Sequence, residues 1–416
     1  TVWLEPVPKR YIAGVRLTPD PGKEELLVRV TGAGEGQGDG WTIEATAWEQ
    51  GKAIAIGEGA ESDGLKLRIP NPKLWTPDSP YLYRLAIRLT RGGVPFDRVE
   101  SYFAMRSFGV GEGADSVRRL LLNGEPLFQH GVLDQGYWPD GLYTAPTDEA
   151  LAYDVEIAKK LGFNMIRKHI KVEPARWYYH CDRLGMIVWQ DMPNGGGGWN
   201  HWHHLVLPNF LSGVRVKDRG LKALGRDSPG NREQFRRELK EMLDALYSAP
   251  SIGAWVPFNE AWGQFDAAEI ARWTKEYDPS RPVDHASGWH DQGAGDLRSA
   301  HVYFRKLRMP KRIRGRAVAI SEYGGYSLTV PGHVWEEGKG FGYKKCRTRE
   351  ELAEAYRRLI DGQLKPLVRQ GISAAVYTQL TDVETELNGL LTYDREILKI
   401  DEERLAAWHS RLFGES

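Results

Sequence analysis

The chain has 416 residues, of which 56 are lysine or arginine and 56 are aspartate or glutamate. This length exceeds that of one small domain and fits one small domain followed by a barrel of about 250 residues. The balanced charge gives no net field that would hold nucleic acid or an anionic membrane, so neutral substrates fit the composition better.

Residues 1–109 are predicted to form an antiparallel β-sandwich. Short runs alternate apolar and polar residues and are separated by Gly, Pro, Asp and Asn; they are residues 25–30, 41–48, 65–69, 82–89 and 99–105. A period of two is typical of strands with one buried face. No cluster of titratable residues stands out in this part of the chain, so we expect a structural role for it.

Residues 110–416 are predicted to form a (β/α)8 TIM barrel, which makes the fold class α/β. Apolar runs typical of buried strands occur at residues 127–132, 164–170, 186–190, 252–258, 282–286, 300–304, 317–321 and 374–379. Amphipathic helices are predicted between and after them, at residues 148–161, 173–184, 232–247, 267–277, 349–368 and 402–412. Eight strands that alternate with helices indicate parallel βα units closed into a barrel.

Two glutamates stand at the ends of predicted barrel strands, Glu260 after the fourth and Glu322 after the seventh. Because working residues of a barrel come from the C-terminal ends of its strands, the two carboxyl groups should face each other across the barrel axis. Glycoside hydrolysis needs one protonated carboxyl group for the leaving oxygen and one ionised carboxylate for the anomeric carbon. A single glutamate here is more often a salt-bridged rim residue, but the pair favours catalysis.

Several further motifs occur in a fixed order along the chain, at residues 72–83, 102–106, 122–131, 164–169, 177–191 and 382–394. With them, nearly the whole sequence resembles glycoside hydrolase family 2, which includes β-galactosidases, β-glucuronidases and β-mannosidases. The resemblance implies an immunoglobulin-like sandwich over residues 1–109 and a catalytic barrel over residues 110–416. It also implies an N-terminal jelly-roll domain ahead of the sandwich, which this sequence lacks.

The resemblance assigns roles to the residues at the barrel mouth. Glu260 would be the acid/base and Glu322 the nucleophile of a retaining double displacement. Asn259 would bind the 2-hydroxyl of the sugar, and Arg167 would hold Glu322 ionised and oriented. Tyr303 would donate a hydrogen bond to the nucleophile.

Four more residues at predicted strand ends are candidates for binding the sugar, and each has a structural role as its alternative: Asp134, His169, Asp191 and Tyr377. We predict a retaining exo-β-glycosidase that removes terminal non-reducing sugars, with β-galactosidase-like specificity. The alternatives are a specificity of the β-glucuronidase, β-mannosidase or arabinosidase type, or a catalytically impaired carbohydrate-binding remnant. Resembling glucuronidases have an Asn-x-Lys pair near strand eight, whereas residues 384–389 contain no lysine, so glucuronidase ranks lower.

Other sequence features indicate no cofactor. Residues 195–204 contain four glycines and three histidines, but no carboxylate at fixed spacing, so we predict a loop that lines the pocket and no metal site. Cys181 and Cys346 lie in different predicted elements and are expected to be free thiols. We expect a carbohydrate substrate and neither a nucleic-acid nor a membrane partner. The sequence indicates no localisation and no oligomeric state.

Overall fold

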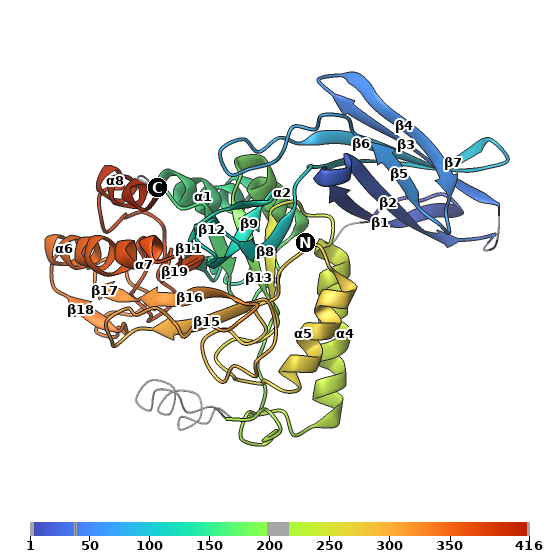
Figure 1. Cartoon of the computed structure of the whole chain (residues 1–416). Coiled ribbons are helices and arrows are strands. Elements are labelled where there is room, and N and C mark those ends of the chain that lie inside the picture. Colours follow the sequence, from blue (N-terminus) through green and yellow to red (C-terminus); the bar gives the residue numbers. More distant parts are fainter. Residues whose placement is uncertain (1–3, 37, 39, 198–215, 414–416) are drawn as a thin grey trace. The chain divides into compact units, whose positions relative to one another are not determined.

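The computed structural model describes residues 4–36, 38, 40–197 and 216–413, and the chain divides into two compact units (Figure 1). The first unit comprises Thr1–Ser107 with Leu243–Pro250, and the second comprises Phe108–Met242 with Ser251–Ser416. Cys181 and Cys346 are both buried free thiols. Among the described residues, no helix combines the length and the apolar composition needed to cross a bilayer.

The first unit contains two antiparallel sheets. One has the order β1 (Arg10–Asp20), β2 (Glu25–Gly34), β5 (Leu65–Arg68), and the other has the order β4 (Lys52–Ala60), β3 (Trp41–Glu49), β6 (Tyr83–Arg91), β7 (Val94–Phe103). Alternate side chains of β3 are buried, as the period of two predicts. The sequence pattern missed β1 and β4, because β1 buries only two of its residues and β4 buries none.

The second unit is a TIM barrel built on one parallel sheet. After a small antiparallel sheet of β8 (Phe108–Glu112), β9 (Arg118–Leu122) and β10 (Glu125–Pro126), the barrel strands are β11 (Gln129–Asp134), β12 (Met165–Lys168), β13 (Ile187–Asp191), β14 (Ile252–Val256), β15 (Leu297–Val302), β16 (Ala317–Gly324) and β19 (Ala374–Thr378). Their order in the sheet is β14-β13-β12-β11-β19-β16-β15. Every residue of β16 and β19 is buried, as expected for strands covered on both faces.

The predicted strand at residues 282–286 does not form a regular strand. Its backbone bonds to β14 where the N–H of Asp284 donates to the oxygen of Trp255 at 2.9 Å. Pro257 lies two residues after Trp255 and has no N–H with which to continue the ladder of hydrogen bonds, so β14 ends at Val256. On the other side, the Ser299 hydroxyl of β15 donates to Asp284 at 2.8 Å. The segment therefore links β14 to β15 through isolated contacts.

The helices follow the predicted ranges closely, and all but the end of α4 belong to the second unit. They are α1 (Asp148–Lys160), α2 (Ala175–Leu184), α4 (Pro229–Leu246), α5 (Ala267–Tyr277), α6 (Arg349–Leu359), α7 (Lys365–Arg369) and α8 (Glu402–Phe413). Thr147 and Thr348 cap α1 and α6 by accepting backbone N–H bonds through their hydroxyls. The helix predicted at residues 349–368 is interrupted by a π-helical segment, Ile360–Leu364, just before Pro366, which cannot donate a helical hydrogen bond.

Two shorter strands, β17 (Tyr326–Leu328) and β18 (Lys344–Cys346), form a parallel pair after β16. The chain between them carries Phe341 and Tyr343, whose ring centroids lie 5.2 Å apart. Phe341 bridges to Glu386 in the segment after β19. The segments that follow β16 and β19 are therefore joined by backbone contacts.

Candidate active site

Glu260 and Glu322 lie close together in the second unit. Glu260 follows β14, and Glu322 lies on β16. One carboxylate oxygen of each lies within 4.8 Å of the other and of a ring nitrogen of His301. The side chain of Glu322 is 4% exposed and that of Glu260 is 24% exposed, so Glu260 is the more accessible of the two.

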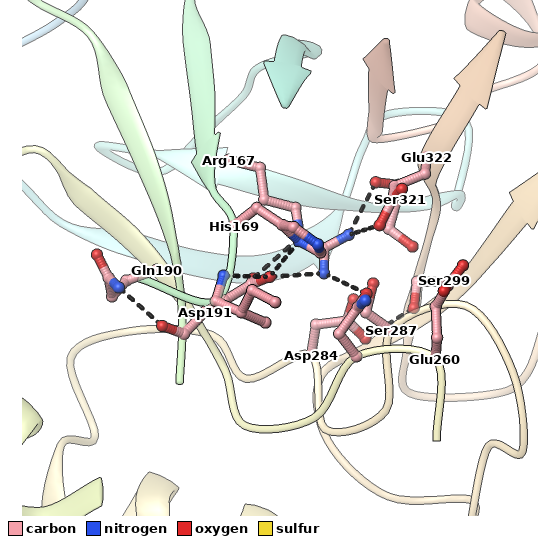
Figure 2. Close-up of polar contacts among 12 residues, drawn as sticks. Arg167, His169, Gln190, Asp191, Glu260, Asp284, Ser287, Ser299, Ser321 and Glu322 are labelled. Atoms are coloured by element: carbon pink, nitrogen blue, oxygen red, sulfur yellow. Dashed lines mark hydrogen bonds and ion pairs between the residues drawn. The ribbon is translucent and has the colours of Figure 1, made fainter. Parts of the chain in front are cut away.

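Arg167 is the centre of the hydrogen-bond network shown in Figure 2. It lies on β12 and is fully buried. Its Nη1 donates to Glu322 Oε1 at 3.0 Å, its Nη2 donates to Asn259 Oδ1 at 2.8 Å, and its Nε and Nη2 hold both oxygens of Asp191 at 2.9 Å. Burial works against the charge, but Asp191 and Glu322 raise the pKa of Arg167 above its usual range. One cation therefore orients Asp191 on β13, Glu322 on β16 and Asn259, which follows β14.

The second oxygen of Glu322 also receives hydrogen bonds. The Tyr303 hydroxyl donates to Oε2, and the Thr378 hydroxyl donates to the same atom at 3.5 Å. Burial, followed by the negative charge of Glu322, raises the pKa of Tyr303 well above its usual value, so the phenol keeps its proton. Donors on both oxygens stabilise the charged form of a carboxylate.

The carboxyl group of Glu260 has a different environment. Burial raises the pKa of Glu260 to about 7, although the charges of His169 and Arg167 act in the opposite direction. Its backbone is also unusual, because Glu260 and the next residue, Ala261, have left-handed φ angles of 50° and 60°. The N–H of Glu260 donates to the backbone oxygen of Ser287 at 3.0 Å, which holds this conformation.

His301 lies between the two glutamates, although sequence reasoning did not single it out. Its Nδ1 lies 3.0 Å from Glu260 Oε1, and its Nε2 lies 3.3 Å from Glu322 Oε1. Burial lowers the pKa of His301 to about 3, despite the opposing charge of Glu322, so the ring is neutral near pH 7. A neutral imidazole carries one proton and can donate to only one of the two carboxyl groups. Its position two residues before Tyr303, within the strand predicted at residues 300–304, is the signal that would have found it.

Asp191 and His169 belong to the same network. His169 Nδ1 lies 3.1 Å from Asp191 Oδ2. Burial opposes the charge of Asp191, but Arg167 holds the pKa of this carboxyl group below its usual value. Burial likewise opposes protonation of His169, whereas the hydrogen bond with Asp191 raises its pKa. The structure thus places both predicted residues beside Arg167.

The structure does not bring Tyr377 or Asp134 into this network. The Tyr377 ring packs against Tyr323 and Tyr356, with ring centroids 5.7 and 4.8 Å apart. Successive residues of a strand point to opposite faces, so Tyr377 points away while Thr378 reaches Glu322. Asp134 is buried and accepts a hydrogen bond from Lys168 Nζ at 2.5 Å.

Lys168 holds together a buried cluster, and we expect its replacement to destabilise the second unit. Its Nζ contacts Asp134 at 2.5 Å and Glu173 at 2.9 Å, and the side chains of all three are at most 3% exposed. Burial opposes the charge, but the two carboxylates raise the pKa of Lys168 above its usual range. Lys168→Met leaves Asp134 without its ion pair, while Glu173 keeps its contact with Lys171 at 2.9 Å, and the loss costs ~3–5 kcal/mol of unfolding free energy in urea titrations.

The matched control is Lys160→Met, which removes the same charge from an exposed position on α1. A substitution at such a site changes the unfolding free energy by ~0.5 kcal/mol or less. Equal destabilisation by the two variants would contradict the structural role of the buried cluster.

Among the residues that the structure describes, two groups of side chains have ligand atoms close enough to share a metal ion: Glu260, His301 and Glu322, and His333, Asp394 and Glu396. In the first group, Arg167 already donates to Glu322 at 3.0 Å, so a second positive charge would be repelled. In the second group, the Glu396 side chain is 70% exposed, and exposed acidic groups of this kind are common. We assign a metal to neither group. The histidines of the loop at residues 195–204 lie outside the described residues.

Comparisons with known proteins agree with this architecture. The model of "Glycosyl hydrolases family 2" matches residues 13–106, and the model of "Glycosyl hydrolases family 2, TIM barrel domain" matches residues 116–323. A β-galactosidase of Lactococcus lactis subsp. lactis (strain IL1403) is 25% identical over 233 residues, which are 55% of this chain and 20% of that protein.

Solved structures also resemble the chain. An FMN-binding β-glucuronidase from Facaelibacterium prausnitzii L2-6 has a TM-score of 0.73 at 20% identity, covering 98% of this chain and 64% of that one. A putative β-galactosidase from Bacteroides fragilis has a TM-score of 0.69 at 19% identity, and the match covers 98% of this chain and 63% of that one. A β-galacturonidase from Eisenbergiella tayi has a TM-score of 0.68 at 18% identity, and the match covers 97% of this chain and 73% of that one. The chain thus spans one fifth of the curated relative and less than two thirds of the first two structures, and these structural likenesses concern the fold alone.

Proposed function

The chain belongs to glycosyl hydrolase family 2, and on this premise we propose that it is a retaining exo-β-glycosidase with β-galactosidase-like specificity. We assign the chemistry to the barrel, residues 110–416, and a structural role to the sandwich, residues 1–109. One observation carries the proposal. Oxygen atoms of Glu260 and Glu322 approach within 4.8 Å, burial raises the pKa of Glu260 to about 7, and Arg167 donates a hydrogen bond to Glu322 at 3.0 Å.

In the first step of the proposed reaction, Glu322 attacks the anomeric carbon and Glu260 gives its proton to the glycosidic oxygen. The bond between carbon and the leaving oxygen breaks, and an ester between the sugar and Glu322 forms. Arg167 and Tyr303 support this assignment, since their hydrogen bonds orient the attacking carboxylate. Burial supports the role of Glu260, because a pKa of about 7 keeps much of the acid protonated near neutral pH.

In the second step, water attacks the same carbon and Glu260 takes its proton. Esterification removes the negative charge of Glu322, so Glu260 loses its proton more readily and can act as a base. Two displacements at one carbon restore the original configuration. Retaining enzymes have carboxyl groups about 5–5.5 Å apart and inverting enzymes about 6.5–9.5 Å apart, so the observed closeness supports retention.

The remaining polar residues of the network are proposed to bind the sugar. Arg167 donates to the amide oxygen of Asn259, which leaves the NH2 group of Asn259 as the donor to the 2-hydroxyl. His169 and Asp191 are proposed to contact the glycone, with Asp191 also fixing Arg167. Asp134 and Tyr377 are left out of this proposal, because their contacts are with other buried groups.

The test is a panel of aryl β-glycosides, with proton NMR of the first product formed. We expect one glycoside of the panel, most readily the β-galactoside, to be cleaved and the β-anomer of the free sugar to appear first. An α-anomer as the first product contradicts retention. A chain that binds sugars but cleaves none of the panel supports the alternative of a carbohydrate-binding protein.

A further inference from the structure

A third carboxylate, that of Glu386, takes no part in the proposed reaction, although it lies near the glutamate pair. It belongs to the segment that follows β19 and is partly buried. The N–H of Glu386 donates to the backbone oxygen of Val383 at 2.9 Å, and the N–H of Leu387 donates to that of Phe341 at 2.9 Å. The backbone on both sides of the carboxylate is therefore fixed.

Amide side chains hold the carboxylate of Glu386. Asn388 Nδ2 donates to its Oε1 at 2.9 Å, and Gln135 Nε2 donates to its Oε2 at 3.3 Å. Gln379 joins the two amides, donating to Asn388 Oδ1 and accepting from Gln135 Nε2, both at 2.8 Å. Within the part of the chain that the structure describes, no basic side chain forms an ion pair with Glu386. Its charge is thus oriented by amides and is not cancelled by a contacting cation from the described residues.

This amide network is continuous with the catalytic pair. Gln379 directly follows Thr378, whose hydroxyl donates to Glu322 at 3.5 Å. Gln135 directly follows the last residue of β11, so it also lies at the end of a barrel strand. The ends of neighbouring parallel strands meet at one edge of a sheet, which places Glu386 at the same edge as Glu322.

The electrostatics of neighbouring groups agree with this placement. Burial raises the pKa of Glu386, and among the charged groups Glu322 raises it further while His169 lowers it. Tyr343 stacks on Tyr303 with ring centroids 3.8 Å apart, and after burial the charges of Glu260, Glu386 and Glu322 all raise its pKa. The charges of these three carboxyl groups therefore all act on Tyr343.

We propose that Glu386 is a specificity-determining residue, which accepts hydrogen bonds from the hydroxyl groups of a neutral sugar and excludes uronic acids from the pocket. The inference rests on the proposed function, because it concerns the same site. An ionised carboxylate is only an acceptor, so it pairs with a hydroxyl but repels a second carboxylate.

The family fold itself does not decide between these two classes of sugar. The solved structures that resemble the chain are described as a β-glucuronidase, a putative β-galactosidase and a β-galacturonidase. Specificity on a shared fold comes from the side chains of the site. A negative charge that two amide side chains hold in place is a repulsive element against uronic acids, and repulsive elements are a common way for binding sites to reject a competitor.

The experiment compares two substrates that differ only at C6, an aryl β-D-galactoside and the corresponding β-D-galacturonide. In the wild-type chain, we expect kcat/KM to be higher for the galactoside. Glu386→Gln keeps the shape of the side chain and removes its charge. We expect it to shift the ratio of galacturonide to galactoside kcat/KM by ~100-fold toward the galacturonide.

Glu384→Gln is the matched control, because it removes the same charge two residues earlier from an exposed side chain. Solvent screens that charge, so the ratio should stay within ~2-fold of the wild type. Calorimetric titration of each variant with galactose and with galacturonate gives the corresponding ratio of binding affinities, which does not depend on catalysis.

The outcomes separate this inference from the proposed function. A wild type that prefers the galacturonide, or an unchanged ratio in Glu386→Gln, overturns the role of Glu386 and leaves the glycosidase intact. If no glycoside is cleaved but the binding ratio shifts as expected, the role of Glu386 stands and the proposed function fails. If neither sugar is cleaved or bound, both are overturned.

Discussion

Glu322→Gln is expected to lower the hydrolysis of aryl β-glycosides by ~10⁵-fold or more, because the neutral amide cannot attack the anomeric carbon. The substitution is nearly isosteric, so Arg167 and Tyr303 lose a charged acceptor but no neighbouring atom is displaced. Initial rates with a chromogenic glycoside measure the effect. Glu276→Gln, which removes a charge from the exposed surface of α5, should retain full activity.

A smaller side chain at this position provides a stricter test. Glu322→Ala leaves room for azide, which can attack the anomeric carbon from the side that the carboxylate normally occupies. One displacement inverts the configuration, so the expected product is an α-glycosyl azide. Activity of Glu322→Gln above ~1% of the wild type would mean that another residue is the nucleophile.

Glu260→Gln is expected to slow hydrolysis by ~10²–10⁴-fold for glycosides with poor leaving groups, because no proton reaches the departing oxygen. A dinitrophenyl glycoside needs no such proton, so formation of the glycosyl ester should stay close to the wild-type rate and the ester should then accumulate. Burst kinetics with the two kinds of leaving group measure this contrast. An equal loss for both would assign Glu260 a role other than that of the acid.

The pKa of Glu260 also predicts how kcat/KM of the wild type depends on pH. The acid must carry its proton, and burial raises the pKa of Glu260 to about 7, so the protonated form is lost as the pH rises through that value. We therefore expect kcat/KM to fall on the alkaline side of about pH 7, and Glu260→Gln to lose this limb. A wild-type profile without an alkaline limb would contradict the assignment.

The arrangement of the barrel could be predicted from the sequence because its strands are buried on both faces. Such strands appear as continuous apolar runs, and polar residues at their ends stand out. The segment at residues 282–286 departs from the prediction, since Pro257 interrupts the ladder that would have made it a regular strand. The edge strands β1 and β4 of the sandwich were missed for the opposite reason, because few of their side chains are buried.

The candidate site was only partly predictable. Glu260, Glu322 and Arg167 each end or nearly end an apolar run, whereas Tyr377 occupies the same kind of position and points to the opposite face. Glu386 lies in an irregular segment and its partners Gln135 and Gln379 are far away in the sequence. No local pattern records such a network, because it exists only after the strands have been brought together.

The left-handed backbone of Glu260 and Ala261 has a consequence for the directed evolution of this chain. This conformation costs ~1–2 kcal/mol for a residue with a Cβ atom, and much less for glycine. Selection for heat tolerance alone would therefore favour Glu260→Gly, and the variants that survive best would lack the proposed acid. A thermostabilisation programme should hold residue 260 constant and screen every round for turnover as well as for melting temperature.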